Sequence, residues 1–281
     1  MADTHVLKEK NLKIANSIES TIDCILREAR FNPRSKVFIN KNCDQIKIVP
    51  LNYDLHFLTL QLDKYLSPTV LEHSLPDNDK YFMSAGNIET YSAIFFSLLD
   101  QMEQFYIQMN SIDELTYVVE PVDISTKHNY RVIKLDNRVY MKIKIDPLEP
   151  KTITATFYGP SKSIERYRKM YLDRIDDWNA NDDIYRNLLK IFDLMAFPQR
   201  SISDNNIEEY CNICYSYRMA GQIPIVSCDN EKCSLIFHSI CLKEWFTTLR
   251  DTKTFLNMTS GRCPSCKEKL STAFKDLLDE E

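Results

Sequence analysis

The stretch CNICYSYRMAGQIPIVSCDNEKCSLIFHSICLKEWF, residues 211–246, followed by GRCPSCKEKL, residues 261–270, decides the fold of the C-terminal part of this chain. Written as spacings, its ligand-type residues read C-x2-C-x13-C-x4-C-x4-H-x2-C-x21-C-x2-C. Thiolates and imidazole are the ligands that Zn²⁺ prefers, and four protein ligands per ion leave no position open for substrate or water. The spacing therefore predicts two structural zinc ions held by eight residues: Cys211, Cys214, Cys228, Cys233, His238, Cys241, Cys263 and Cys266.

Alternate pairing along the chain is expected for eight ligands in this order. The first site would then use Cys211, Cys214, His238 and Cys241, and the second Cys228, Cys233, Cys263 and Cys266. A segment this small buries too little apolar area to fold alone, whereas a structural zinc ion contributes on the order of 10 kcal/mol. Metal binding and folding are therefore expected to be one event.

Four Cys, one His and three Cys are the ligand order of two finger classes, the PHD fingers that read histone tails and a subset of RING fingers. PHD fingers carry a tryptophan two residues before the seventh ligand, and that position is Gly261 here. This difference favours a cross-braced RING finger of the C4HC3 type. A PHD-like reader or adaptor module without enzymatic activity stays as the alternative.

RING fingers present a shallow apolar groove to an E2 ubiquitin-conjugating enzyme. The three positions that form such a groove are Ile213, Trp245 and Pro264 in this sequence. An exposed tryptophan on a rigid scaffold is typical of an interface hot spot. Two alternatives stay open: Trp245 and Ile213 could simply fill the small core of the finger, and Lys267, after the last ligand, is either a contact to E2 and ubiquitin or a solvated lysine.

Upstream of the finger, the periodicity predicts an α+β region. Apolar residues three and four apart indicate an amphipathic helix from Leu12 to Ala29, and short β-rich stretches (KVFIN, QIKIVP, LHFLTLQL) predict an antiparallel meander. A helical period from Ile88 to Met109 predicts one long helix packed on that meander. We expect these elements to form a first lobe, residues 1–112.

The same order of elements, strands followed by helices, recurs in residues 113–200. Strands are predicted at LTYVVE, YRVIKL, RVYMKIKI and TITATFY, with a break at Gly159-Pro160 and helices over 164–178 and 184–195. The third predicted domain, 201–281, contains the finger and most of a polar linker, 198–209, that precedes it. The formal net charge of -5 gives no basic surface for nucleic acid, so we expect no direct DNA binding. Neither a run of 18 apolar residues nor a signal peptide occurs, so we expect an intracellular protein that does not bind membranes.

The finger, together with DELTYVVEP (residues 113–121) and RVYMKIKIDPLEP (residues 138–150), resembles the Fanconi anaemia complementation group L (FANCL) family. The resemblance implies two RWD lobes with a UBC-like fold and a RING-type E3 ubiquitin ligase. It also implies recruitment of an E2 of the T type, docking of the paired Fanconi substrate proteins by the double RWD region, and monoubiquitination in interstrand crosslink DNA repair. Further implications are membership of the Fanconi core complex and a location in nucleus and cytoplasm.

One departure from the family pattern limits which family properties we expect in this chain. Family members carry an additional E2-like domain before the double RWD region, and this chain of 281 residues is expected to be too short for it. The two lobes themselves contain neither a His-Pro-Asn stretch nor a suitably placed cysteine, the groups an E2 needs for its oxyanion and nucleophile. We therefore expect no catalytic residue of E2 type, and we interpret both lobes as binding surfaces.

Overall fold

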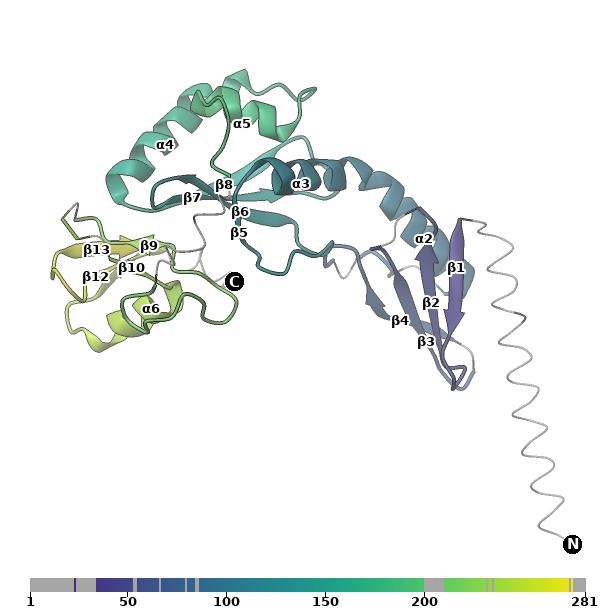
Figure 1. Cartoon of the computed structure of the whole chain (residues 1–281). Helices are drawn as coiled ribbons and strands as arrows, with labels where there is room; N and C mark the ends of the chain where they lie inside the picture. Colours follow the sequence, from purple (N-terminus) through teal and green to yellow (C-terminus); the bar gives the residue numbers. More distant parts are fainter. Residues whose placement is uncertain are drawn as a thin grey trace, which may run out of the picture. The chain divides into compact units, whose positions relative to one another are not determined.

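The computed structural model describes residues 23, 34–52, 55–65, 67–78, 80–83, 86–199, 210–230, 232–233, 235–272 and 274 (Figure 1). The chain divides into two compact units, one ending at Glu103 and the other beginning at Gln104. The helix predicted between Leu12 and Ala29 lies outside the described residues apart from Asp23. Among the helices that are described, none has both the length and the apolar character required to cross a membrane.

An antiparallel meander forms the first unit, as the sequence predicted. Its strands are β1 (Ser35–Ile39), β2 (Gln45–Pro50), β3 (Leu58–Leu62) and β4 (Pro68–His73), in the order β1-β2-β3-β4. Apolar side chains alternate along β2 and β3, so these two central strands bury one of their faces. Helix α2 (Ile88–Gln101) packs on β3 and adds Phe95 and Leu99 to this core.

Strand β4 was missed by the sequence analysis. It begins at Pro68, which has no N–H to donate, and within the described residues it pairs only with β3. Proline is tolerated at the first residue of an edge strand for that reason. The strand also carries a register shift opposite Thr59 and Leu60, which breaks the simple alternation that a strand prediction needs.

The prediction of one helix from Ile88 to Met109 was wrong. Two helices occupy this region, α2 and α3 (Glu103–Leu115), and they are interrupted at Met102, a fully buried residue. The second helix is anchored within the second unit, because the carboxylate of Asp113 accepts two hydrogen bonds from the buried guanidinium of Arg131, at 2.5 and 2.8 Å. Neither proline nor glycine marks the break, and the apolar period runs straight through it.

After α3, the second unit continues with four antiparallel strands at the four predicted segments, in the order β5-β6-β7-β8. They are β5 (Val118–Glu120), β6 (Tyr130–Asp136), β7 (Val139–Ile145) and β8 (Ile153–Tyr158). Three helical segments follow: α4 (Ser161–Arg174), the short 3₁₀ helix η1 (Ile175–Asp177) and α5 (Ile184–Phe192). Helices α4 and α5 pack against each other, and α4 lies on β8 (Figure 1). The boundaries predicted for the three domains, 1–112, 113–200 and 201–281, remain a prediction.

The finger consists of short elements around one helix. They are β9 (Val226–Ser227), β10 (Ile236–Phe237), α6 (Ser239–Thr248), β11 (Lys253–Phe255), β12 (Met258–Arg262) and β13 (Lys269–Thr272). β9 pairs with β10, and β11, β12 and β13 form a second small antiparallel sheet. The ligand-bearing loops lie between these strands and the helix.

The predicted break at Gly159-Pro160 is confirmed, and it demands glycine. Gly159 has φ +145°, and a Cβ atom there would lie 2.5 Å from the carbonyl oxygen of Arg138. We therefore expect Gly159→Ala to lower the free energy of unfolding by about 2 kcal/mol or more, because the β6–β7 turn would have to shift. Urea unfolding followed by circular dichroism measures this. Gly86→Ala is the matched control, since no atom lies within 4 Å of its added Cβ; equal midpoints for the two variants would contradict the prediction.

Candidate metal centre and E2-binding surface

The two C-x2-C segments fold into the same tight turn. In the first, the N–H of Tyr215 donates to the carbonyl of Cys211 at 2.8 Å, and the N–H of Cys211 donates to Ser216 at 3.0 Å. Tyr215 and Lys267, which follow the second cysteine of each pair, both adopt positive φ, 57° and 62°. The equivalent bonds of the second turn run from Lys267 N–H to Cys263 O, 3.2 Å, and from Cys263 N–H to Glu268 O, 2.9 Å. Each turn thus directs two sulfur atoms to one side.

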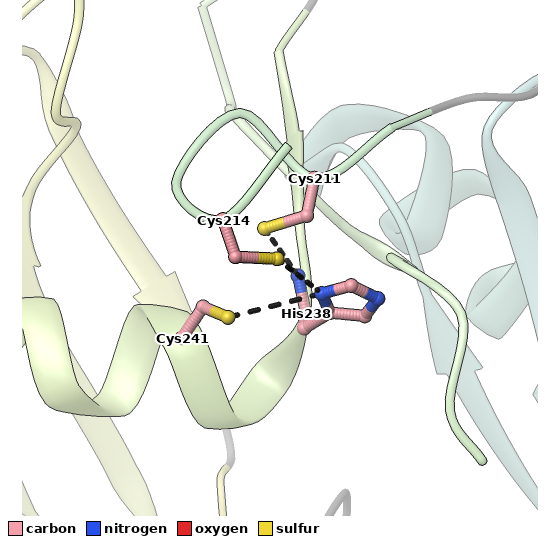
Figure 2. A group of neighbouring side chains, drawn as sticks. All are labelled: Cys211, Cys214, His238 and Cys241. Atoms are coloured by element: carbon pink, nitrogen blue, oxygen red, sulfur yellow. Dashed lines mark hydrogen bonds between the residues drawn. The ribbon is translucent and has the colours of Figure 1, made fainter. Parts of the chain in front are cut away.

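The first turn meets the start of α6 in a group of four ligand atoms, from Cys211, Cys214, His238 and Cys241 (Figure 2). All four atoms lie within 4.8 Å of one another. Nδ1 of His238 is 3.4 Å from Sγ of Cys214 and 3.8 Å from Sγ of Cys241. In a tetrahedral zinc site, metal bonds of roughly 2.0 and 2.3 Å place neighbouring ligand atoms about 3.5 to 3.8 Å apart. The group has the dimensions of a closed zinc site.

His238 is oriented by its second ring nitrogen. Nε2 lies 3.1 Å from the carbonyl oxygen of Tyr217. A carbonyl can only accept, so Nε2 carries the proton and Nδ1 presents its lone pair to the three thiols. Burial lowers the pKa of His238, which keeps the ring neutral at pH 7 as a metal ligand requires.

The second group contains four sulfur atoms, from Cys228, Cys233, Cys263 and Cys266, again within 4.8 Å of one another. The Sγ atoms of Cys228 and Cys266 are 3.5 Å apart, and those of Cys233 and Cys263 are 3.9 Å apart. Around a tetrahedral Zn²⁺ with Zn–S bonds of about 2.3 Å this separation is about 3.8 Å. The two groups can therefore hold two structural zinc ions, and they alternate along the chain as the sequence predicted.

Protons compete with the metal at these thiols. Burial raises the pKa of Cys241 to about 12. Burial also acts to raise the pKa of Cys266, but hydrogen bonds from the Glu268 N–H and from neighbouring thiols outweigh it and lower that pKa to about 7. Since zinc binds the thiolate form, metal binding must release protons, and zinc affinity must fall as pH falls.

Gly261, the position where a PHD finger would carry tryptophan, has no room for a side chain. A Cβ atom at Gly261 would lie 2.7 Å from Cδ1 and Cε1 of Phe246. Phe246 is itself buried against Phe274, with ring centroids 5.7 Å apart. A tryptophan at position 261 would therefore clash with Phe246 of α6, which disfavours the reader alternative.

Trp245, the next residue towards the N-terminus of α6, is half-buried against the finger core. Its indole N–H donates to the carbonyl of Arg262 at 2.8 Å. Nζ of Lys267 lies 5.6 Å from the ring centroid and donates to the carbonyl of Pro264 at 2.5 Å. Trp245 and Pro264 are therefore joined through Lys267 on the rim of the second ligand turn.

Ile213 lies on the first ligand turn and is also half-buried against the finger core. Ile213 and Trp245 therefore both pack against the core of the finger with part of the side chain. The rest of each side chain is exposed to solvent.

Some residues of the centre were missed by the sequence analysis. Tyr217 orients His238 through its main-chain carbonyl, and any residue could supply that group, so the sequence holds no signal for it. Met219 accepts a hydrogen bond from the thiol of Cys241 at 3.4 Å. Met219 is not part of the Cys/His spacing, so the sequence contains no pattern that would single it out.

Chelation should release two zinc ions per chain and unfold the finger while the β5–β8 sheet stays folded, because metal ligation holds the finger together. Release should be faster at pH 5 than at pH 7.5, since protons compete for the thiolates and for Nδ1 of His238. A zinc-sensitive dye gives the stoichiometry, and amide hydrogen exchange locates the unfolding. The β6–β7 hairpin is the internal control, and a metal-free chain with full protection in α6 would contradict the prediction.

Comparisons with known proteins agree with this centre. Residues 104–200 match the family model of the FANCL UBC-like domain 3, and residues 207–275 match that of the FANCL C-terminal domain. The E3 ubiquitin-protein ligase Fancl of Drosophila melanogaster is 39% identical over 257 residues, which are 86% of this chain and 67% of that protein. The E3 ubiquitin-protein ligase FANCL of Mus musculus is 28% identical over 222 residues, 77% of this chain and 59% of the mouse protein.

A solved crystal structure of FANCL superposes on this chain with a TM-score of 0.77 at 37% identity, covering 92% of this chain and 74% of that one. The mixed α+β architecture, the UBC-like domain and the finger with two Cys/His groups are thus shared with that structure. The chain belongs to the FANCL family of E3 ubiquitin-protein ligases.

Proposed function

We propose that the finger recruits an E2 through Ile213, Trp245 and Pro264. The observation that carries this proposal is the placement of Trp245, which is held by its N–H to Arg262 and by the Lys267 ammonium while part of its ring stays exposed. A tryptophan fixed in this way loses little conformational entropy on binding, so it is suited to anchor an interface. The predicted preference for an E2 of the T type comes from the family resemblance.

In this function the zinc ions stabilise the scaffold and take no part in the reaction. The ε-amine of a substrate lysine, in its neutral form, attacks the thioester carbonyl that links ubiquitin to the E2 cysteine. The carbon–sulfur bond breaks, an isopeptide bond forms, and the cysteine thiol leaves with the proton that the amine gives up. The finger accelerates this transfer by holding E2-linked ubiquitin in a reactive pose.

We further propose that the two lobes dock the paired Fanconi substrate proteins and that the product is monoubiquitinated substrate in interstrand crosslink DNA repair. The match of residues 104–200 to a UBC-like family domain supports a protein-binding role for this part of the chain. A nuclear site of action and association with core complex subunits follow from the same proposal. These finer properties are inferred for this chain from its family. The chain covers 67% and 59% of the length of the two relatives.

Trp245→Ala should abolish the discharge of E2-linked ubiquitin onto free lysine, because removing the indole removes the anchor of the E2 interface. The cost expected for such a hot spot is about 2 kcal/mol or more, roughly a 30-fold loss of E2 affinity. The assay uses E2-linked ubiquitin of several E2 types, and zinc content is measured in parallel.

Trp178→Ala is the matched control. Trp178 is the other of the 2 tryptophans in the chain, and its indole N–H donates to the carbonyl of Lys151 within the second lobe at 2.8 Å. Discharge by the Trp245 variant at the rate of the Trp178 variant, with two zinc ions bound in each, would refute the proposed surface. Ile213→Ala tests the same surface from the first ligand turn.

A further inference from the structure

The finger and the β5–β8 sheet share one apolar cluster. Buried residues of the sheet, including Val132, Tyr140 and Tyr158, belong to the same cluster as Ile223 and Ile225 of the finger. These residues lie in the unit that begins at Gln104. Apolar contact is non-directional, so it brings two surfaces together without fixing their rotation.

Two carboxylates add direction to this contact, one from each side. Oε1 of Glu120, at the end of β5, accepts a hydrogen bond from the main-chain N–H of Ile223 at 3.1 Å. Oδ1 of Asp229, in the finger, accepts from both the N–H and the hydroxyl of Ser161 at 2.9 and 2.5 Å. Charged hydrogen bonds of this kind are short and depend on orientation.

Asp229 supplies a helix cap that α4 lacks in its own segment. The N-cap residue of α4 is Pro160, which makes no side-chain capping bond. The first N–H groups of a helix need acceptors, and a carboxylate also interacts favourably with the positive end of the helix dipole. Here that carboxylate comes from 68 residues further along the chain, directly after the zinc ligand Cys228.

We propose that Glu120 and Asp229 are positioning residues that hold the finger in one orientation on the second lobe, and that this orientation decides which lysines the E2-linked ubiquitin can reach. The inference rests on the proposed ligase function. E2 binding and the reactive pose of the thioester depend on Ile213, Trp245 and Pro264, which neither carboxylate contacts. The two carboxylates should therefore affect where ubiquitin is attached and leave discharge itself unchanged.

The test compares the full chain with Glu120→Ala, Asp229→Ala and the double Ala variant. Amide hydrogen exchange should rise about tenfold or more at Ile223 and Ser161 in the double variant, since charged hydrogen bonds are lost there. Discharge of E2-linked ubiquitin onto free lysine should equal that of the wild type. In reactions without added substrate, the set of lysines modified on the chain itself, mapped by mass spectrometry, should become broader.

A conservative double variant, Glu120→Gln with Asp229→Asn, keeps an oxygen acceptor at each position and should restore most of the wild-type lysine pattern. Asp251→Ala is the control, because that carboxylate pairs with Arg262 inside the finger, at 2.5 Å. A double Ala variant with wild-type exchange and a wild-type lysine pattern would overturn the proposal and leave the apolar cluster as the sole attachment. If the wild type discharges no E2, the ligase function and the lysine selection both fail, while the exchange data still decide whether the carboxylates hold the finger.

Discussion

Tetrahedral ligation of two metal ions is the constraint on which the finger depends. The elements of the finger are short: β9 and β10 have 2 residues each, and α6 has 10. Elements of this length do not persist alone in water, because the hydrogen bonds and apolar area that they gain are small against the entropy of ordering them. Two closed sites add to the small apolar core of the finger. One joins the first ligand turn to α6, and the other joins the segment 228–233 to the second ligand turn.

The alternating arrangement has a consequence for the surface that faces a partner. Each metal group ties together segments that are far apart in sequence, so the two ligand turns and α6 cannot move independently. Ile213, Trp245 and Pro264 are on these three segments, one on each. A partner that touches all three meets a surface already fixed by metal bonds, which lowers the entropy that binding must overcome. Phe246, the residue after Trp245 in the same helix, is buried and lies against Gly261.

Local patterns explain what the sequence could and could not predict. The two Cys/His groups could be predicted because zinc chemistry restricts residue type and spacing. Most strands of the two four-stranded sheets could be predicted because alternation is a property of neighbouring residues. The break at Met102 escaped because the apolar period of Leu99, Met102 and Phe105 is the same on both sides, while the partner of each helix changes from one core to another. Strand β4 escaped because Pro68 opens it. The hydrogen bond of Glu120 joins residues 103 positions apart in the sequence, and that of Asp229 joins residues 68 positions apart. Patterns among neighbouring residues cannot predict contacts over such separations.

The position of Asp229 links the metal to the lobe. It follows Cys228 directly, so we expect metal binding by the second group to stabilise the loop that carries this carboxylate. The capping of α4 is then conditional on zinc, although α4 lies outside the finger. Free energy supplied by ligation is in this way passed to a helix of the neighbouring lobe, because a cap stabilises a helix end by about 1 kcal/mol. Metal loss would remove both the proposed E2 surface and the contact between Asp229 and Ser161, so the two proposals depend on the same metal centre.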